Sequence, residues 1–186
     1  VQPLINMADG HGFNEVFFTD HEILDEHRLD EEGRGWAVAM TTLQHERGAG
    51  GLVMPFAGGQ VSKSAIDTAA AALIELAKRS PRNGKTAADD PVIRDRIMQL
   101  VIRQNGMAQN GRRSGVDALV DHPMRIPMQG KVVGSELTQE VTALALEIVG
   151  AASTLYIGDE NAPDSGQWVH EYLNSFGGTI AAGTSE

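Results

Sequence analysis

The sequence predicts a mainly helical protein, an up-and-down four-helix bundle that follows a short N-terminal β segment. Apolar residues recur every three or four positions in the segments after residue 34, whereas the first 20 residues lack this spacing. Residues that start and stop helices flank the periodic segments. With 186 residues, 41% of them hydrophobic, the chain can bury one substantial core.

The N-terminal part is expected to be extended. Its aromatic side chains, from Phe13 to Phe18, show little helical spacing and suit one or two short strands that end near Thr19-Asp20. The polar, acidic residues 25–33 are interpreted as a loop. Helical periodicity starts only after this loop.

The first helix should begin near Gly35-Trp36 and run to Ala77. Its weak point is the stretch 48–59, which holds five glycines and Pro55. Because an interior glycine costs about 1 kcal/mol and an interior proline about 3 kcal/mol relative to alanine, we expect a kink or break there. Residues 80–84 indicate a helix stop and a loop.

The second helix has a clear start at Asp90-Pro91. Aspartate can cap the free backbone amides, and proline at the first helical position loses no hydrogen bond. The stripe expected to face the core consists of Ile93, Ile97, Leu100, Val101 and Met107.

The third helix is expected after a loop over residues 121–130, with Gly150 as its end. Its predicted core stripe is Leu137, Val141, Leu144, Ala145 and Ile148. A fourth helix should start near Gln167, align Trp168, Tyr172 and Phe176, and close at Gly177-Gly178. These helices, with moderate connections between them, predict the bundle.

Composition excludes several classes of function. The absence of cysteine excludes disulfides, thiolate catalysis and thiolate metal sites. A formal net charge of -10, with acidic and basic residues interleaved, argues against nucleic-acid binding. No apolar run approaches the roughly 20 residues of a membrane span, and no signal peptide is recognisable, so we expect a cytoplasmic protein. The chain starts without methionine, so targeting information, including a mitochondrial address, could precede it.

Histidines give no sign of a metal site. None of the six has a glutamate three residues before it, which argues against a di-iron bundle protein. His45 and His170 each precede a glutamate, but adjacent helical residues diverge, so both are interpreted as surface histidines. We predict no metal.

Glu46 has two interpretations. Small residues 48–51 follow it, so another group could approach this face closely, and a carboxylate in a dry site can act as a base. An exposed ion pair with Arg47 explains the same residues. Spacing alone leaves both open.

The order of several motifs resembles one family. Thr41 to Gly48 and the terminal Gly183-Thr184-Ser185-Glu186 resemble the two halves of the active site of acyl-CoA dehydrogenases. Further blocks keep the family's order and spacing over nearly the whole chain, namely residues 13–20, 32–36, 90–94, 134–139 and 145–150. The resemblance implies that residues 1–33 are the end of a middle β domain with its connecting loop, and that residues 34–186 are the C-terminal helical domain.

The family's activity is oxidation of an acyl-CoA thioester to its 2,3-enoyl form with FAD, within lipid metabolism and β-oxidation. The resemblance implies a glutamate base at one of two positions. The position directly before Gly183 is occupied by Ala182, which cannot accept a proton, so the resemblance points to Glu46. Gln44 and Arg47, beside it, are then expected to contact substrate.

The resemblance also implies residues that contact the cofactor. By resemblance, Thr184, Ser185 and Glu186 form the flavin-contacting turn, while Gly84, Lys85 and Gly150 retain parts of motifs that contact FAD. The chain departs from the family where a phenylalanine should precede Gly84 and where Glu147 replaces a glutamine.

The resemblance also implies partners: electron-transfer flavoprotein as acceptor and a homo- or hetero-tetramer built around the helical domains. An apolar stripe packed within one subunit explains the helices equally well. Three other functions stay open: a silent subunit that completes a partner's site, a flavin oxidase or monooxygenase, and a helical scaffold without ligand.

Overall fold

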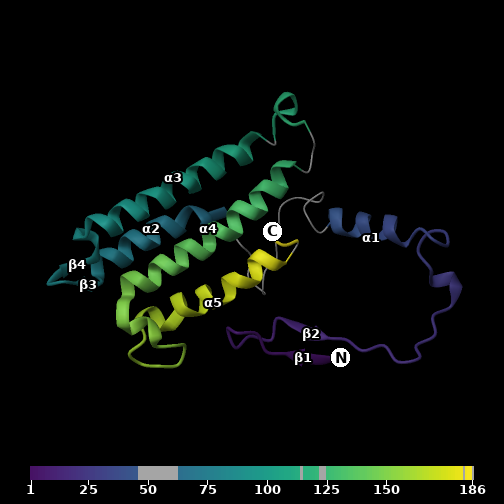
Figure 1. Ribbon diagram of the computed structural model, residues 1–186, viewed down its shortest axis with the longest axis horizontal. Helices are drawn as coiled ribbons and strands as arrows, with labels where there is room; N and C mark the ends of the chain where they lie inside the picture. Colours follow the sequence, from purple (N-terminus) through teal and green to yellow (C-terminus); the bar gives the residue numbers. More distant parts are fainter. Residues whose placement is uncertain (46–62, 114, 122–124, 182, 186) are drawn as a thin grey trace.

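The protein is described by a computed structural model over residues 1–45, 63–113, 115–121, 125–181 and 183–185. Four helices form an antiparallel bundle: α2 (Lys63–Arg79), α3 (Pro91–Arg113), α4 (Arg125–Val149) and α5 (Gln167–Ile180). Each runs opposite to its neighbour in the chain, and α4 packs against the other three (Figure 1). The predicted fold class, a mainly α bundle, is confirmed.

The predicted apolar stripes build the core of this bundle. All five residues expected on the third helix are buried, and three of the five on the second helix are at most 5% exposed. Val101 and Met107 are partly buried against them. The remaining core comes from the last turns of α2 and from the connection that follows, as Leu73, Leu76, Ala77 and Ala87.

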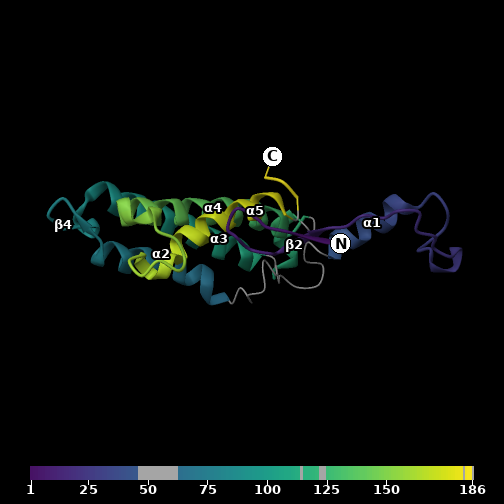
Figure 2. The same cartoon turned by 90° about the horizontal axis from the view of Figure 1, so that it is seen from below.

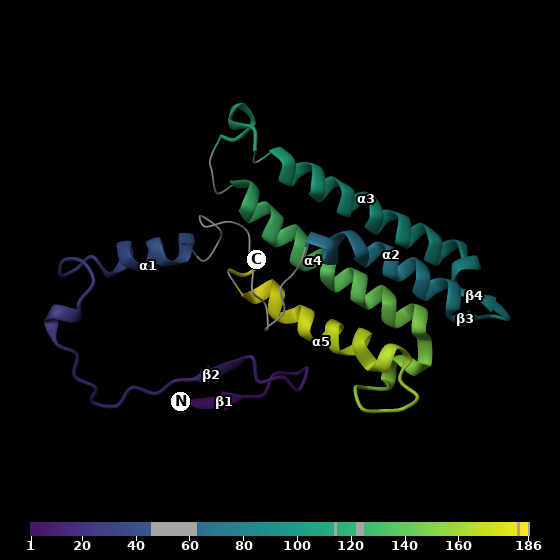
Figure 3. The same ribbon diagram turned by 180° about the vertical axis from the view of Figure 1, so that it is seen from behind.

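The N-terminal part lies beside the bundle and extends beyond it (Figures 2 and 3). Strands β1 (Gln2–Leu4) and β2 (Phe13–Glu15) form an antiparallel hairpin, with Gln2 opposite Glu15. The Tyr156 hydroxyl donates a 2.7 Å hydrogen bond to the Ala8 carbonyl and so ties this hairpin to the α4–α5 connection. Burial, and then the nearby Asp9 charge, raises the pKa of Tyr156, so the phenol keeps the proton it donates.

Helix α1 (Gly35–Gln44) lies apart from the other helices (Figure 3). Its start agrees with the sequence prediction. The predicted break at residues 48–59 lies outside the described residues, which show α1 ending at Gln44 and α2 beginning at Lys63.

A short β-hairpin with a two-residue turn follows α2, where the sequence indicated a loop without strands. Strands β3 (Pro81–Arg82) and β4 (Lys85–Thr86) pair through Asn83 and Gly84, both with positive φ. Asn-Gly between two extended pairs favours this type of tight turn, because glycine and asparagine tolerate positive φ.

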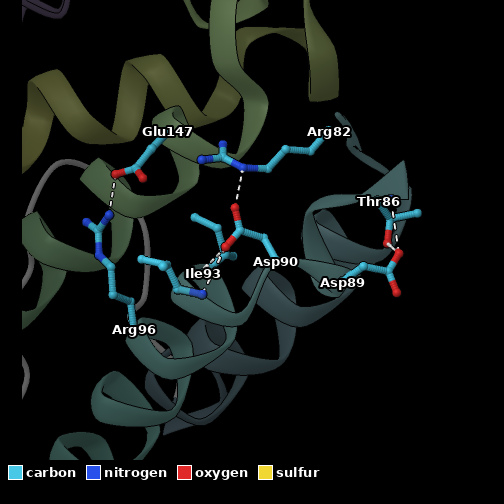
Figure 4. Close-up of polar contacts among 8 residues, drawn as sticks. Arg82, Thr86, Asp89, Asp90, Ile93, Arg96 and Glu147 are labelled. Atoms are coloured by element: carbon cyan, nitrogen blue, oxygen red, sulfur yellow. Dashed lines mark hydrogen bonds and ion pairs between the residues drawn. The ribbon is translucent and has the colours of Figure 1, made fainter. Parts of the chain in front are cut away.

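Helix α3 starts as predicted. The Asp90 side chain accepts hydrogen bonds from the backbone amides of Val92 at 2.9 Å and Ile93 at 3.4 Å (Figure 4). Its other carboxylate oxygen accepts from Arg82 at 2.7 Å, which joins the hairpin to the helix. Short 3-10 turns complete the connections at Asp25–His27, Ala87–Asp89, Asp117–Leu119, Gly150–Thr154 and Pro163–Gly166.

Two predicted helix boundaries are wrong, and so is the predicted exposure of one histidine. Helix α4 begins at Arg125, inside the predicted loop 121–130, because burial of Ile126 rewards an earlier start. Helix α5 continues through Gly177-Gly178 to Ile180, since packing on α4 outweighs the low helix propensity of glycine. The predicted surface residue His170 is only 29% exposed, and its Nδ1 is buried, whereas His45 is exposed as predicted.

Left-handed backbone precedes α5. Asp164, Ser165 and Gly166 all have positive φ, at 50°, 56° and 75°. Asp164 is held there by Arg79, the last residue of α2, whose guanidinium donates to both carboxylate oxygens, and by the indole of Trp168 at 2.7 Å. The Arg79 hydrogen bonds lower the pKa of Asp164, so this clasp is charged at neutral pH.

Candidate functional site

The C-terminal segment, residues 183–185, folds back against the last turn of α5. The Ser185 amide donates a 3.0 Å hydrogen bond to the Thr179 carbonyl. Gly183 has a φ of +105°, a conformation that side chains other than glycine rarely adopt. Thr184 is exposed. Of the predicted flavin-contacting turn, Thr184 and Ser185 therefore lie in a defined loop, and Glu186 lies outside the described residues.

Two residues of α4 bind the end of α5, one of them also binds this segment, and sequence reasoning missed both. The Lys131 ammonium donates to the carbonyls of Gly183 and Thr179, and the Gln139 amide donates to the Thr179 hydroxyl at 3.3 Å. The two are eight residues apart, which places them on one face of a helix. The sequence indicated a loop up to residue 130, directly before Lys131. It therefore did not predict that this face of α4 would contact the end of the chain.

The other predicted cofactor residues lie at the opposite end of α4. Gly84 and Lys85 are exposed on the β3–β4 hairpin, and a Cβ added at Gly84 would meet nothing within 4 Å. Gly150 terminates α4 with a φ of +70° and is equally open. Their surroundings therefore leave space for a ligand or a protein surface.

Glu147 lies where the resemblance expected a glutamine, and its carboxylate is bound by another residue of the same chain. It accepts a hydrogen bond from Arg96 across the α3–α4 contact (Figure 4). This pair also shows that the start of α3 and the end of α4 lie together. Gly150 thus sits at the same end of the bundle as the hairpin.

The two groups of candidate residues are far apart. From Lys131, beside the C-terminal segment, to Gly150 the α4 axis rises about 28 Å at 1.5 Å per residue. The structure does not bring Gly84, Lys85 and Gly150 together with Thr184 and Ser185. Each group belongs to a separate surface.

Of the predicted base and substrate contacts, the structure describes Gln44 alone. Gln44 is the last residue of that helix, and the backbone of His45 continues it. Glu46 and Arg47, as well as Ala182, lie outside the described residues. Convergence of Glu46 with the C-terminal segment therefore stays a prediction.

Metal and membrane sites are not found in the part of the chain that the structure describes. No cluster of three or more histidine, aspartate or glutamate side chains there could hold a metal ion. Likewise, none of the helices within the described ranges is long and apolar enough to cross a lipid bilayer.

Comparison with known proteins decides the family. Residues 33–186 match the family described as acyl-CoA dehydrogenase, C-terminal domain. The chain belongs to the acyl-CoA dehydrogenase family. This match confirms the resemblance drawn from the sequence motifs, and it covers the described helices α1 to α5.

Relatives with known names agree with the acyl-CoA dehydrogenase assignment. The chain is 32% identical over 190 aligned residues to the protein named acyl-CoA dehydrogenase IpdE1 of Mycolicibacterium smegmatis and 28% identical over 187 to IpdE1 of Mycobacterium tuberculosis. Each alignment covers 100% of this chain but only 42% and 44% of the relative. The chain thus spans less than half the length of these acyl-CoA dehydrogenases.

A solved structure shares the fold. The protein described as an FAD-dependent dehydrogenase aligns with a TM-score of 0.60 over 84% of this chain and 38% of its own, at 17% sequence identity. At that identity, the likeness shows that the helical arrangement is common to both.

Proposed function

We propose that the full-length protein containing this chain is an FAD-dependent acyl-CoA dehydrogenase that introduces a double bond between the α and β carbons of an acyl-CoA thioester. The observation that carries the proposal is the family match over residues 33–186. The order of the motifs at residues 41–48 and 183–186 supports it. We further propose residues 1–33 as the end of a β domain. Ten large apolar side chains exposed before Leu29 suit contact with more protein.

The chemical character of the candidate residues fits FAD. The C-terminal segment offers a hydroxyl at Thr184 on a backbone held by Lys131, and the far end offers the Lys85 ammonium beside open backbone at Gly84 and Gly150. Hydroxyls, backbone amides and a cation are suitable partners for the ring oxygens and phosphates of a flavin nucleotide. When bound, FAD would act as the oxidant, because it would accept the hydride lost from the β carbon.

Glu46 is proposed as the base. Its carboxylate would take the proton from the α carbon, and the electron pair of that C–H bond would become the new carbon–carbon double bond. With Ala182 at the other family position, no second carboxylate competes for this role there. A base held in a dry site would have a raised pKa, which suits abstraction from a weak carbon acid. Gln44 and Arg47 are proposed to orient the substrate beside it.

An oligomer is proposed from the division of the candidate residues, and a tetramer by analogy with the family. The C-terminal segment and the Gly84–Gly150 end are about 28 Å apart along α4. One subunit would therefore contact its own flavin at one end and a neighbour's at the other. Electron-transfer flavoprotein is the proposed acceptor, by analogy with the family.

A mixed oligomer is the second candidate. In it, this chain would complete a partner's site without turning over substrate itself. The departures from the family's FAD-contacting motifs, at the position before Gly84 and at Glu147, favour this arrangement, whereas the presence of Glu46 argues against it. Native mass spectrometry of the co-purified complex separates one subunit type from two.

The decisive experiment is an anaerobic titration of the purified full-length protein with a panel of acyl-CoAs, followed by flavin absorbance. Removal of a general base should slow bleaching about 10²- to 10⁴-fold in Glu46→Gln. The matched control is Glu75→Gln, which changes an exposed carboxylate paired with Lys78 on α2.

Each outcome assigns a role. Bleaching in the parent and in Glu75→Gln, but not in Glu46→Gln, would support dehydrogenation with Glu46 as base. Equal bleaching in all three would refute that assignment. Absence of flavin would favour the silent subunit, and rapid reoxidation of reduced flavin by oxygen would indicate an oxidase or monooxygenase.

A further inference from the structure

The Lys131 side chain reaches from α4 to both ends of the loop that follows α5. Its ammonium donates to the Gly183 carbonyl and, at 3.4 Å, to the Thr179 carbonyl. The Thr179 carbonyl also accepts from the Ser185 amide at 3.0 Å and from the Ser185 hydroxyl at 3.4 Å. The Lys131 ammonium thus links the Gly183 carbonyl to the Thr179 carbonyl. Because Ser185 also binds the Thr179 carbonyl, the residues on both sides of Thr184 are held.

The position of this ammonium suits the electrostatics of a helix end. The last carbonyls of a helix lack intrahelical donors and carry partial negative charge, so a lysine there is stabilising. Lys131 is half-buried, and within the described ranges it forms no ion pair with a carboxylate. Its charge is therefore directed to backbone carbonyls of the C-terminal segment.

The face of α4 that carries Lys131 is fitted to the end of α5. Gln139, two turns further along, donates to the Thr179 hydroxyl, which itself donates to the Phe176 carbonyl at 2.9 Å. Between them, a Cβ built on Gly178 would lie 3.8 Å from the Ser135 Cβ. The last turn of α5 is thus fixed against α4, while the loop beyond it is held through Lys131 and Ser185.

We propose that Lys131 is a positioning residue that holds the C-terminal segment in the conformation in which it contacts the flavin. The inference rests on the proposed function, because that function makes Thr184 and Ser185 cofactor contacts. Lys131 acts through the backbone of Gly183 and Thr179.

The test uses the full-length protein and three variants. Lys131→Met removes the charge and keeps the length, Lys131→Arg restores a cation, and Lys78→Met removes a lysine exposed on α2 as a control. Hydrogen exchange of the peptide covering residues 177–186 is measured in the flavin-free protein. The dissociation constant of FAD and the flavin absorption spectrum are measured after reconstitution.

We expect Lys131→Met to speed amide exchange in this peptide about tenfold or more, as loss of charge-assisted hydrogen bonds implies. The FAD dissociation constant should rise by a similar factor, with a shifted flavin spectrum. Lys131→Arg should restore both, and Lys78→Met should leave both as in the parent. Exchange in peptides of α2 and α3 should not change, which would show that the variant is folded.

Unchanged exchange in Lys131→Met would overturn the inference, whatever the activity of the parent. Faster exchange with an unchanged FAD dissociation constant and spectrum would overturn its link to the cofactor. Failure of the proposed function is a separate result, because it appears in the parent as absence of flavin or absence of bleaching by every acyl-CoA.

Discussion

Among the glycines that the structure describes, Gly166 is the one where an added methyl group should lower the stability of the fold most. Its φ of +75° is left-handed, and a Cβ there would lie 2.5 Å from the Ile157 nitrogen and 2.6 Å from the Tyr156 carbonyl carbon. Both contacts are backbone atoms, so no side chain can swing away. Gly166→Ala should therefore lose stability for two reasons, the left-handed conformation and the steric overlap.

The cost can be divided between these two causes. Alanine in a left-handed conformation costs about 1 kcal/mol or slightly more. Forcing a methyl group into a filled space adds about 1–3 kcal/mol. We expect Gly166→Ala to destabilise the helical domain by about 3 kcal/mol in total.

Gly84→Ala is the matched control. Gly84 has the same φ of +75°, but a Cβ there would meet nothing within 4 Å. Its cost should therefore be about 1 kcal/mol, from the conformation alone. The difference between the two variants isolates the overlap at Gly166.

The assay is urea unfolding of the flavin-free full-length protein, followed by circular dichroism at 222 nm. Because the loss of stability equals the midpoint shift multiplied by the slope, the Gly166→Ala midpoint should fall roughly three times as far as that of Gly84→Ala. Equal shifts for the two variants would refute the reasoning, since they would show that the overlap is relieved at no cost.

Two further predictions concern carboxylates that join helices to their connections. Asp90→Ala should destabilise the domain by about 1–2 kcal/mol, because it removes the α3 cap and the ion pair with Arg82. Asp90→Asn can still cap the helix, so it should lose less stability. Equal urea midpoints for the two variants would contradict the capping role. Because Arg79 lowers the pKa of Asp164 in the folded state, the clasp contributes stability above the unfolded-state value of about 4 and loses it as pH falls through the lower folded value. Stability measured from pH 7 to pH 3 should therefore fall less in Asp164→Asn than in the parent, and parallel curves would show that the clasp contributes nothing.

Local patterns were sufficient for much of the helical domain. The stripes on α3 and α4, the Asp90 cap and the Gly150 terminator each depend on residues within a few turns, so the sequence predicted them correctly. The same local rules misjudged the start of α4 and the end of α5. There, burial of Ile126 and packing of α5 on α4 outweigh local propensity.

For the candidate site, sequence motifs identified the family and proposed its residues, but they could not give their arrangement. The sequence by itself determined a helical acyl-CoA dehydrogenase domain, because periodicity, caps and motif order are properties of the chain alone. Only the tertiary structure decided that Lys131 binds the C-terminal segment and that Gly150 lies at the other end of α4, about 28 Å along the helix from Lys131. The physical reason is that such contacts join residues some 50 positions apart, and only the packing of α5 on α4 makes them neighbours.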